Sequence, residues 1–160
     1  MSRRLASHLR RTVDGPMWHG PALMELLGTV TVAQATVRPI PSAHTIAELV
    51  LHMTAWADIA GARLRGTAPA EVTPAMDWPS ADSLDESKWH DALARLRASY
   101  DALAAQTEAM SDADLRGIVP ASEPDHTVET MLRGVVEHGV YHGGQVALLK
   151  RALESAAPSR

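Results

Sequence analysis

Cysteine and phenylalanine are both absent from this chain of 160 residues. Without cysteine, the protein can form no disulfide bond, no zinc site with thiolate ligands and no covalent intermediate on a cysteine side chain. Any bound metal ion would therefore need nitrogen and oxygen ligands.

Strong charge of one sign and long apolar runs are also missing. The formal net charge is only −4 at pH 7, and no basic, aromatic-lined face stands out, so we expect no nucleic-acid partner. No stretch approaches the roughly 20 continuous apolar residues of a membrane-spanning helix, so no membrane partner is expected. No apolar run follows the N-terminal arginines, as it would in a signal peptide, and the expected location is the cytoplasm.

The composition that remains is typical of a globular protein. Apolar residues make up 46% of the chain and charged residues 21%, and the length corresponds to a single domain over residues 1–160. Within it we expect residues 1–14 to be an N-terminal extension and residues 155–160 to be a tail. A short amphipathic piece from Leu5 to Val13 would give the extension an extra turn or short helix.

Apolar side chains recur at steps of three and four residues along most of the chain, which is the period of an amphipathic helix. This pattern predicts four long helices, over residues 21–35, 45–66, 83–110 and 127–154. Thr45 and Ser83 each begin a Ser/Thr-x-x-Glu capping box, which marks the start of a helix. No segment alternates apolar and polar residues between turns, so no strand is expected. The predicted fold class is all-α, as a four-helix bundle.

The connections between these helices limit their arrangement. The first two predicted helices are joined by a short link, so we expect them to be antiparallel neighbours. The connector after Gly66, over residues 67–80, is long enough to run back along the bundle. It is therefore compatible with one crossover connection as well as with a plain up-down-up-down order. A further loop is expected around Pro120, Pro124 and Asp125.

Eight histidines are present, and three of them lie in predicted helices among apolar neighbours. His138 and His142 are four residues apart in the last helix, so both side chains project from one face, at the spacing with which two imidazoles bind one metal ion. His52 lies in the second helix. Helical bundles build metal sites from facing helices. Three imidazoles without a fourth protein ligand would leave a coordination position open for water or substrate.

Each of these patterns also has an explanation without a metal. A His-x-x-x-His pair arises often by chance, and Gly139 stands where the metalloprotease signature requires glutamate. A single histidine such as His52 is more often a hydrogen-bonded residue of the core than a ligand. Four other histidines fall at predicted helix ends or in loops, where we expect them to be solvated: His8, His44, His90 and His126.

Four side chains near the three histidines are candidates for supporting roles. Glu48, one helical turn before His52, is a candidate catalytic base or orienting residue, and otherwise only the carboxylate of the capping box. Gln145 is a second catalytic candidate that would line the pocket, and otherwise part of the helix surface. Trp56 and Tyr141 are candidates for substrate binding, with packing as the alternative for both.

Several stretches of the sequence resemble motifs of one known superfamily. The run GVVEHGVYHGGQVALL, from Gly134 to Leu149, resembles the last-helix motif of the DinB-like (DinB/YfiT) superfamily. The run from Ala43 to Trp56 resembles its second-helix motif. Three shorter strings resemble one bacterial branch: Trp18-His-Gly-Pro21, Arg63-Leu-Arg-Gly66 and Asp77-Trp-Pro79. The resemblance covers nearly the whole chain.

The resemblance implies a four-helix bundle with one crossover, which is often a homodimer. It also implies a divalent metal ion held by three histidines, which correspond here to His52, His138 and His142. Zinc or nickel is the expected ion, with iron and manganese as alternatives, because affinity order alone does not decide which metal occupies a site in the cell.

The resemblance implies a chemistry as well. Relatives include transferases and isomerases that use a low-molecular-weight thiol, and some are hydrolases. The leading hypothesis is therefore a metal-dependent transferase that uses a low-molecular-weight thiol on a small electrophilic substrate. Metal-assisted hydrolysis and a non-catalytic, stress-related metal-binding bundle remain alternatives, and the residues alone do not decide between them.

Overall fold

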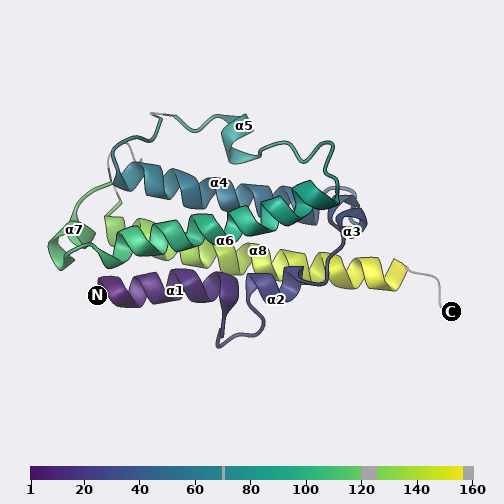
Figure 1. The fold of residues 1–160 in the computed structure, drawn as a ribbon, viewed down its shortest axis with the longest axis horizontal. Coiled ribbons are helices and arrows are strands. Elements are labelled where there is room, and N and C mark those ends of the chain that lie inside the picture. Colours follow the sequence, from purple (N-terminus) through teal and green to yellow (C-terminus); the bar gives the residue numbers. More distant parts are fainter. Residues whose placement is uncertain (70, 120–125, 157–160) are drawn as a thin grey trace.

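The computed structural model describes residues 1–69, 71–119 and 126–156 and is all-helical (Figure 1). Four long helices form a bundle: α1 (Ser2–Asp14), α4 (Ile46–Leu64), α6 (Glu86–Glu108) and α8 (Val128–Ala156). Short helices lie in the connections: α2 (Leu23–Leu27), α3 (Val32–Thr36), α5 (Pro74–Asp77) and α7 (Asp112–Arg116). Within the described ranges there is no strand, and no helix is long and apolar enough to cross a membrane. The prediction of an all-α bundle is confirmed.

Two predicted segments extend beyond the described residues. The loop expected around Pro120, Pro124 and Asp125 falls in residues 120–125, which lie outside the described ranges. The same is true of residues 157–160 of the predicted tail. The part of that tail that is described continues the last helix, because α8 ends at Ala156.

The first bundle helix is not the one that the sequence pattern indicated. Residues 21–35, predicted as one helix, form α2 and α3 with a break between them, and Thr31 caps α3. The place in the bundle belongs to α1, in the segment expected as an N-terminal extension. Leu5, Leu9 and Val13 form an apolar stripe on α1, and each is at most 2% exposed. This stripe is buried where α1 packs against α6 and α8, so the segment is part of the core.

The directions of the helices follow from ion pairs and from the path of the chain. Arg10 pairs with Glu108 at 3.0 Å and Asp14 pairs with Arg97 at 2.7 Å, so α1 and α6 are antiparallel. The connection from α4 to α6 returns along the bundle through α5, so these two helices are parallel and the connection is a crossover (Figure 1). The predicted antiparallel pair of first helices does not form as one helix pair, because residues 21–35 are divided into α2, which packs against α8, and α3, which packs against α4.

One of the two predicted capping boxes is present. At the start of α4, Thr45 accepts a hydrogen bond from the Glu48 amide at 3.1 Å, and the Glu48 carboxylate accepts one from the Thr45 amide at 2.7 Å. The box predicted at Ser83 is wrong. Helix α6 begins after Asp85, whose side chain accepts from the Lys88 amide at 2.8 Å. Asp85 therefore provides the cap that the pattern assigned to Ser83.

Helix α8 approaches α1 and α6 closely at Gly139. A Cβ atom at this position would lie 2.6 Å from Thr12 Cγ2 and 2.8 Å from Tyr100 Oη, both shorter than ordinary contacts. Tyr100 is completely buried, so its ring has little room to move. The absence of a side chain at Gly139 thus allows α8 to pack closely against α1 and α6 at the position next to His138.

Candidate metal centre

Three histidines from α4 and α8 meet between these helices. Nε2 of His138 lies 2.9 Å from Nε2 of His52 and 2.9 Å from Nε2 of His142. His52 and His142 are each only 5% exposed. The structure therefore brings together the three histidines selected from the sequence, and the cluster could hold a metal ion.

Two of the three rings are oriented by acceptors on their outer nitrogen. Nδ1 of His52 donates to the backbone carbonyl of Asp77 at 2.6 Å and lies 3.3 Å from the Asp77 carboxylate. Nδ1 of His142 donates to Oε1 of Gln145 at 2.7 Å. A proton held on Nδ1 by such a partner leaves the Nε2 lone pair free for a metal. The Nδ1 atom of His138 is buried and has no hydrogen-bond partner among the described residues.

Burial favours the neutral form of the His138 and His142 rings. Burial, followed by the nearby His142 and His52, lowers the pKa of His138 to about 4, although Asp77 acts in the opposite direction. Burial also lowers the pKa of His142, against the effect of its bond to Gln145. Neutral imidazole is the form that binds metal. Imidazole lone pairs 2.9 Å apart repel each other unless a proton or a cation lies between them, so this set of donors fits a divalent cation.

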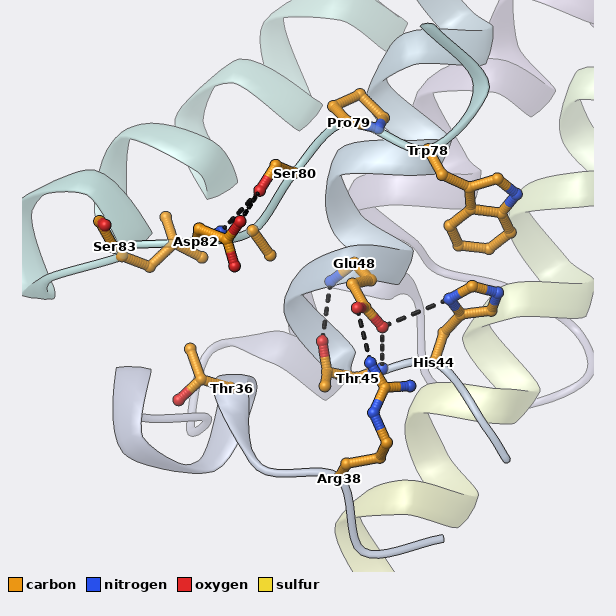
Figure 2. A pocket seen from close by; sticks show the side chains of 12 residues that line it. Thr36, Arg38, His44, Thr45, Glu48, Trp78, Pro79, Ser80, Asp82 and Ser83 are labelled. Carbon is orange, nitrogen blue, oxygen red and sulfur yellow. Dashed lines mark hydrogen bonds and ion pairs between the residues drawn. The ribbon is translucent and has the colours of Figure 1, made fainter. Parts of the chain in front are cut away.

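The crossover connection supplies two residues at the site that sequence analysis did not select. Trp78 stacks on His52 with ring centroids 3.8 Å apart, and on His44 with centroids 3.6 Å apart. Figure 2 shows Trp78 beside His44. Asp77 contacts His52 through its carbonyl and its carboxylate. The Asp77-Trp-Pro79 string, noted for its resemblance to a bacterial branch, was the signal for these contacts, but it lies 25 residues from His52.

A cavity of about 420 Å³ adjoins the histidine cluster. Its walls include His52 and His138 and also Trp56, Arg63, Met131 and Val135; we call it the Trp56 cavity. Nε1 of Trp56 donates to the Asp77 carboxylate at 2.7 Å, which holds the indole in the wall. The structure thus places Trp56, a candidate for substrate binding, in a cavity that reaches two of the three histidines.

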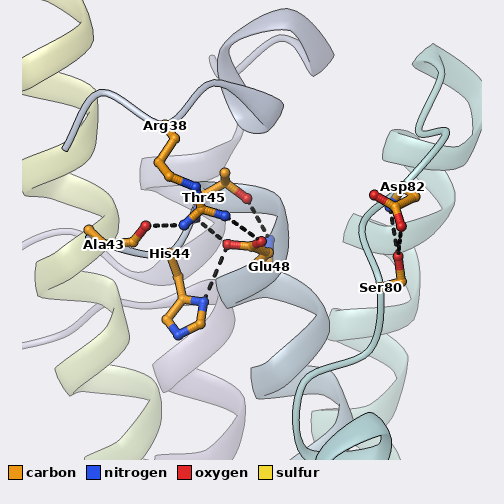
Figure 3. A network of polar contacts seen from close by, with 7 residues as sticks. All are labelled: Arg38, Ala43, His44, Thr45, Glu48, Ser80 and Asp82. Atoms are coloured by element: carbon orange, nitrogen blue, oxygen red, sulfur yellow. Dashed lines mark hydrogen bonds and ion pairs between the residues drawn. The ribbon is translucent and has the colours of Figure 1, made fainter. Parts of the chain in front are cut away.

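Glu48 belongs to a separate polar network (Figure 3). Besides capping α4, its carboxylate pairs with Arg38 at 2.7 Å and lies 3.3 Å from Nδ1 of His44. Burial raises the pKa of Glu48, but its bonds to Thr45, Arg38 and His44 outweigh burial and hold the pKa below its usual value. Glu48 lines a second pocket of about 620 Å³, which also includes Trp78 (Figure 2). Its hydrogen bonds and ion pairs are thus made in this pocket, with Thr45, Arg38 and His44.

The last two candidates lie on α8 beside His142. Gln145 is partly buried and accepts the hydrogen bond that orients this ring. Tyr141 is 64% exposed, and its ring meets that of His142 edge-on with centroids 4.9 Å apart. Gln145 is therefore placed to orient the His142 ring, whereas the Tyr141 hydroxyl lies on a largely solvent-exposed side chain.

The fold and the cluster together define a class of protein: an all-helical bundle with one crossover and three convergent imidazoles between two of its long helices. A family model described as the DinB superfamily matches residues 18–146, so the chain belongs to the DinB superfamily. A solved structure, described as a conserved protein from Enterococcus faecalis, is similar to the chain with a TM-score of 0.66 and 17% identity, over 96% of this chain and 95% of that one. At this identity, the likeness shows the fold alone. A comparison with curated proteins found no match.

Proposed function

We propose that this protein is a metal-dependent transferase that joins a low-molecular-weight thiol to a small electrophilic substrate. The observation that carries the proposal is the convergence of three imidazole Nε2 atoms beside a cavity. Three nitrogen ligands leave a position for a further ligand. A purely structural ion would need no adjoining cavity, so the Trp56 cavity favours an enzyme over a non-catalytic bundle.

Each residue around the cluster has a role in this proposal. When bound, a divalent ion would supply Lewis-acid chemistry that lowers the pKa of a thiol or a water molecule. Asp77 and Gln145 hold the imidazoles of His52 and His142 with Nε2 directed inward. Trp56 shields one side of the site from water, and its bond to Asp77 fixes that side to the crossover connection.

Elemental analysis of untagged protein tests the metal site, because an affinity tag can load nickel artificially. We expect about one divalent ion per chain in the wild type and none in His138→Ala. His90→Ala is the matched control, since His90 is an exposed histidine on α6 and should keep the ion. Protein without metal that also takes up none on addition would refute the proposal. Metal-loaded protein should then accelerate the addition of a small thiol to an electrophile, and His138→Ala should not.

We further propose that the protein works as a homodimer. Trp18 is 98% exposed in the loop before α2, and Tyr141 and Leu148 on α8 are 64% and 57% exposed. That loop and α8 line a common pocket through His19, Val140 and Ala147, which are the chain neighbours of Trp18, Tyr141 and Leu148. Sedimentation equilibrium should give twice the chain mass of 17.2 kDa. A mass of one chain at micromolar concentration would refute the dimer and leave the metal site unaffected.

A further inference from the structure

One cation in the wall of the Trp56 cavity, Arg63, has no acidic partner among the residues that the structure describes. Arg63 lies in the last turn of α4, and its Cζ atom is 5.8 Å from the centre of the Trp56 ring. The ion pairs found among the described residues use other arginines: Arg10, Arg38, Arg95, Arg97 and Arg133. A guanidinium group presents a planar set of donors that matches a carboxylate. The cavity wall therefore carries an unused donor group for an anion.

The rest of the wall is mainly apolar. Trp56 and Met131 offer apolar surface between Arg63 and the histidines, and Gly134 leaves open space, because a Cβ atom there would meet nothing within 4 Å. Asp77 is the acidic residue of the wall, and its carboxylate is engaged by Trp56 at 2.7 Å and lies at the histidine end. The carboxylate of Asp77 is thus already engaged by Trp56, whereas no ion pair to Arg63 is found among the described residues.

The dimensions of the cavity limit the size of a ligand. Its volume of about 420 Å³ is near the lower end for small-molecule pockets. The Trp56 ring, which lies next to the Arg63 guanidinium, is also 6.5 Å from the His52 ring and 6.3 Å from the His138 ring, measured between centroids. A short molecule packed on Trp56 can therefore reach both the arginine and the histidines.

We propose that the Trp56 cavity binds a small monocarboxylate with an apolar body. Its carboxylate pairs with Arg63, its body packs on Trp56 and Met131, and its other end faces His52 and His138. One cation matches one negative charge, which favours a monocarboxylate over a phosphate or a dicarboxylate. That this molecule is the electrophilic substrate rests on the proposed function, whereas its binding to Arg63 does not.

Two probes of equal size test the charge preference: 3-phenylpropanoate and its neutral amide, 3-phenylpropanamide. Calorimetric titration uses the full chain after metal has been removed with a chelator, so the outcome does not depend on the metal site. We expect the wild type to bind the carboxylate about tenfold or more tightly than the amide, the size of effect expected for a hydrogen-bonded charge. Equal affinities for the two probes would overturn the proposal.

Substitutions show which residue causes the preference for the carboxylate over the amide. Arg63→Gln should remove it while leaving the affinity for the amide unchanged, and the amide result shows that the cavity is still folded. Arg65→Gln is the matched control, because Arg65 is exposed and outside this cavity, and it should keep the full preference. Gly134→Leu should weaken both probes by filling the cavity, whereas Gly144→Leu on the same helix should weaken neither. A preference that persists in Arg63→Gln would overturn the assignment.

These titrations fail separately from the metal experiment. If the wild type shows no preference for the carboxylate but elemental analysis gives one ion per chain, the monocarboxylate proposal is rejected and the transferase proposal stays in place. A preserved preference in a chain that takes up no metal would support the cavity assignment and reject the proposed function.

Discussion

Gly139→Ala should destabilise the protein, although the same substitution normally stabilises a helix. Replacing glycine by alanine inside a helix contributes about 1 kcal/mol of stability through propensity alone. At Gly139 the new Cβ would lie 2.6 Å from Thr12 Cγ2 and 2.8 Å from Tyr100 Oη. Relieving this overlap means shifting well-packed groups, at a cost of about 1–3 kcal/mol.

Gly134→Ala provides the reference, since it lies on the same helix and its Cβ would meet nothing within 4 Å. It should show the propensity gain alone. The two variants should therefore differ by the overlap cost, which for a protein of this size corresponds to melting temperatures roughly 3–9 °C apart. Thermal unfolding followed by circular dichroism, on protein freed of metal, measures this difference. Equal stabilisation by the two alanines would refute the close approach of α8 to α1 and α6.

A second substitution shows whether Thr12 is the cause. Thr12→Ser removes Cγ2 and keeps the hydroxyl that donates to the His8 carbonyl at 2.9 Å. Alone, it should cost about 0.8 kcal/mol, because one buried methyl group is lost. In the Gly139→Ala background it should cost less or stabilise, since the methyl is then the overlapping atom. Additive effects in this double-mutant cycle would show that the overlap lies elsewhere.

Three other outcomes are expected. Gln145→Ala should weaken metal binding about 10–100-fold in a chelator competition, because His142 loses the acceptor that orients it; unchanged affinity would show that the bond is dispensable. Glu48 should stabilise the fold above its unfolded pKa near 4.5, and this contribution should disappear as the pH falls below that value, because the folded state holds the pKa lower. In urea unfolding, the free energies of unfolding of wild type and Glu48→Gln should therefore converge in acid. A difference that stays constant with pH would contradict the contacts of Glu48. If the chemistry is thiol transfer, Glu48→Gln should leave the rate nearly unchanged, whereas loss of activity would favour hydrolysis with Glu48 as the base.

The local features of the site were determined by the sequence itself. Four residues of helix place His138 and His142 on one face whatever the rest of the chain does, because the helical repeat is local. The capping box at Thr45 likewise starts α4 and so sets where His52 falls along that helix. Helical periodicity, free of strand-like alternation, was enough for the all-α class.

Other features depended on the tertiary structure, because they join residues far apart in the chain. The contact of Asp77 with His52 exists only because the crossover returns along α4, and no local pattern encodes that path. The close approach at Gly139 depends on Thr12 and Tyr100, which come from two other helices. The role of α1 as a bundle helix was missed for the same reason: a short apolar stripe such as Leu5 to Val13 has the same pattern at the surface of a bundle and inside it, and only packing decides which of the two it is.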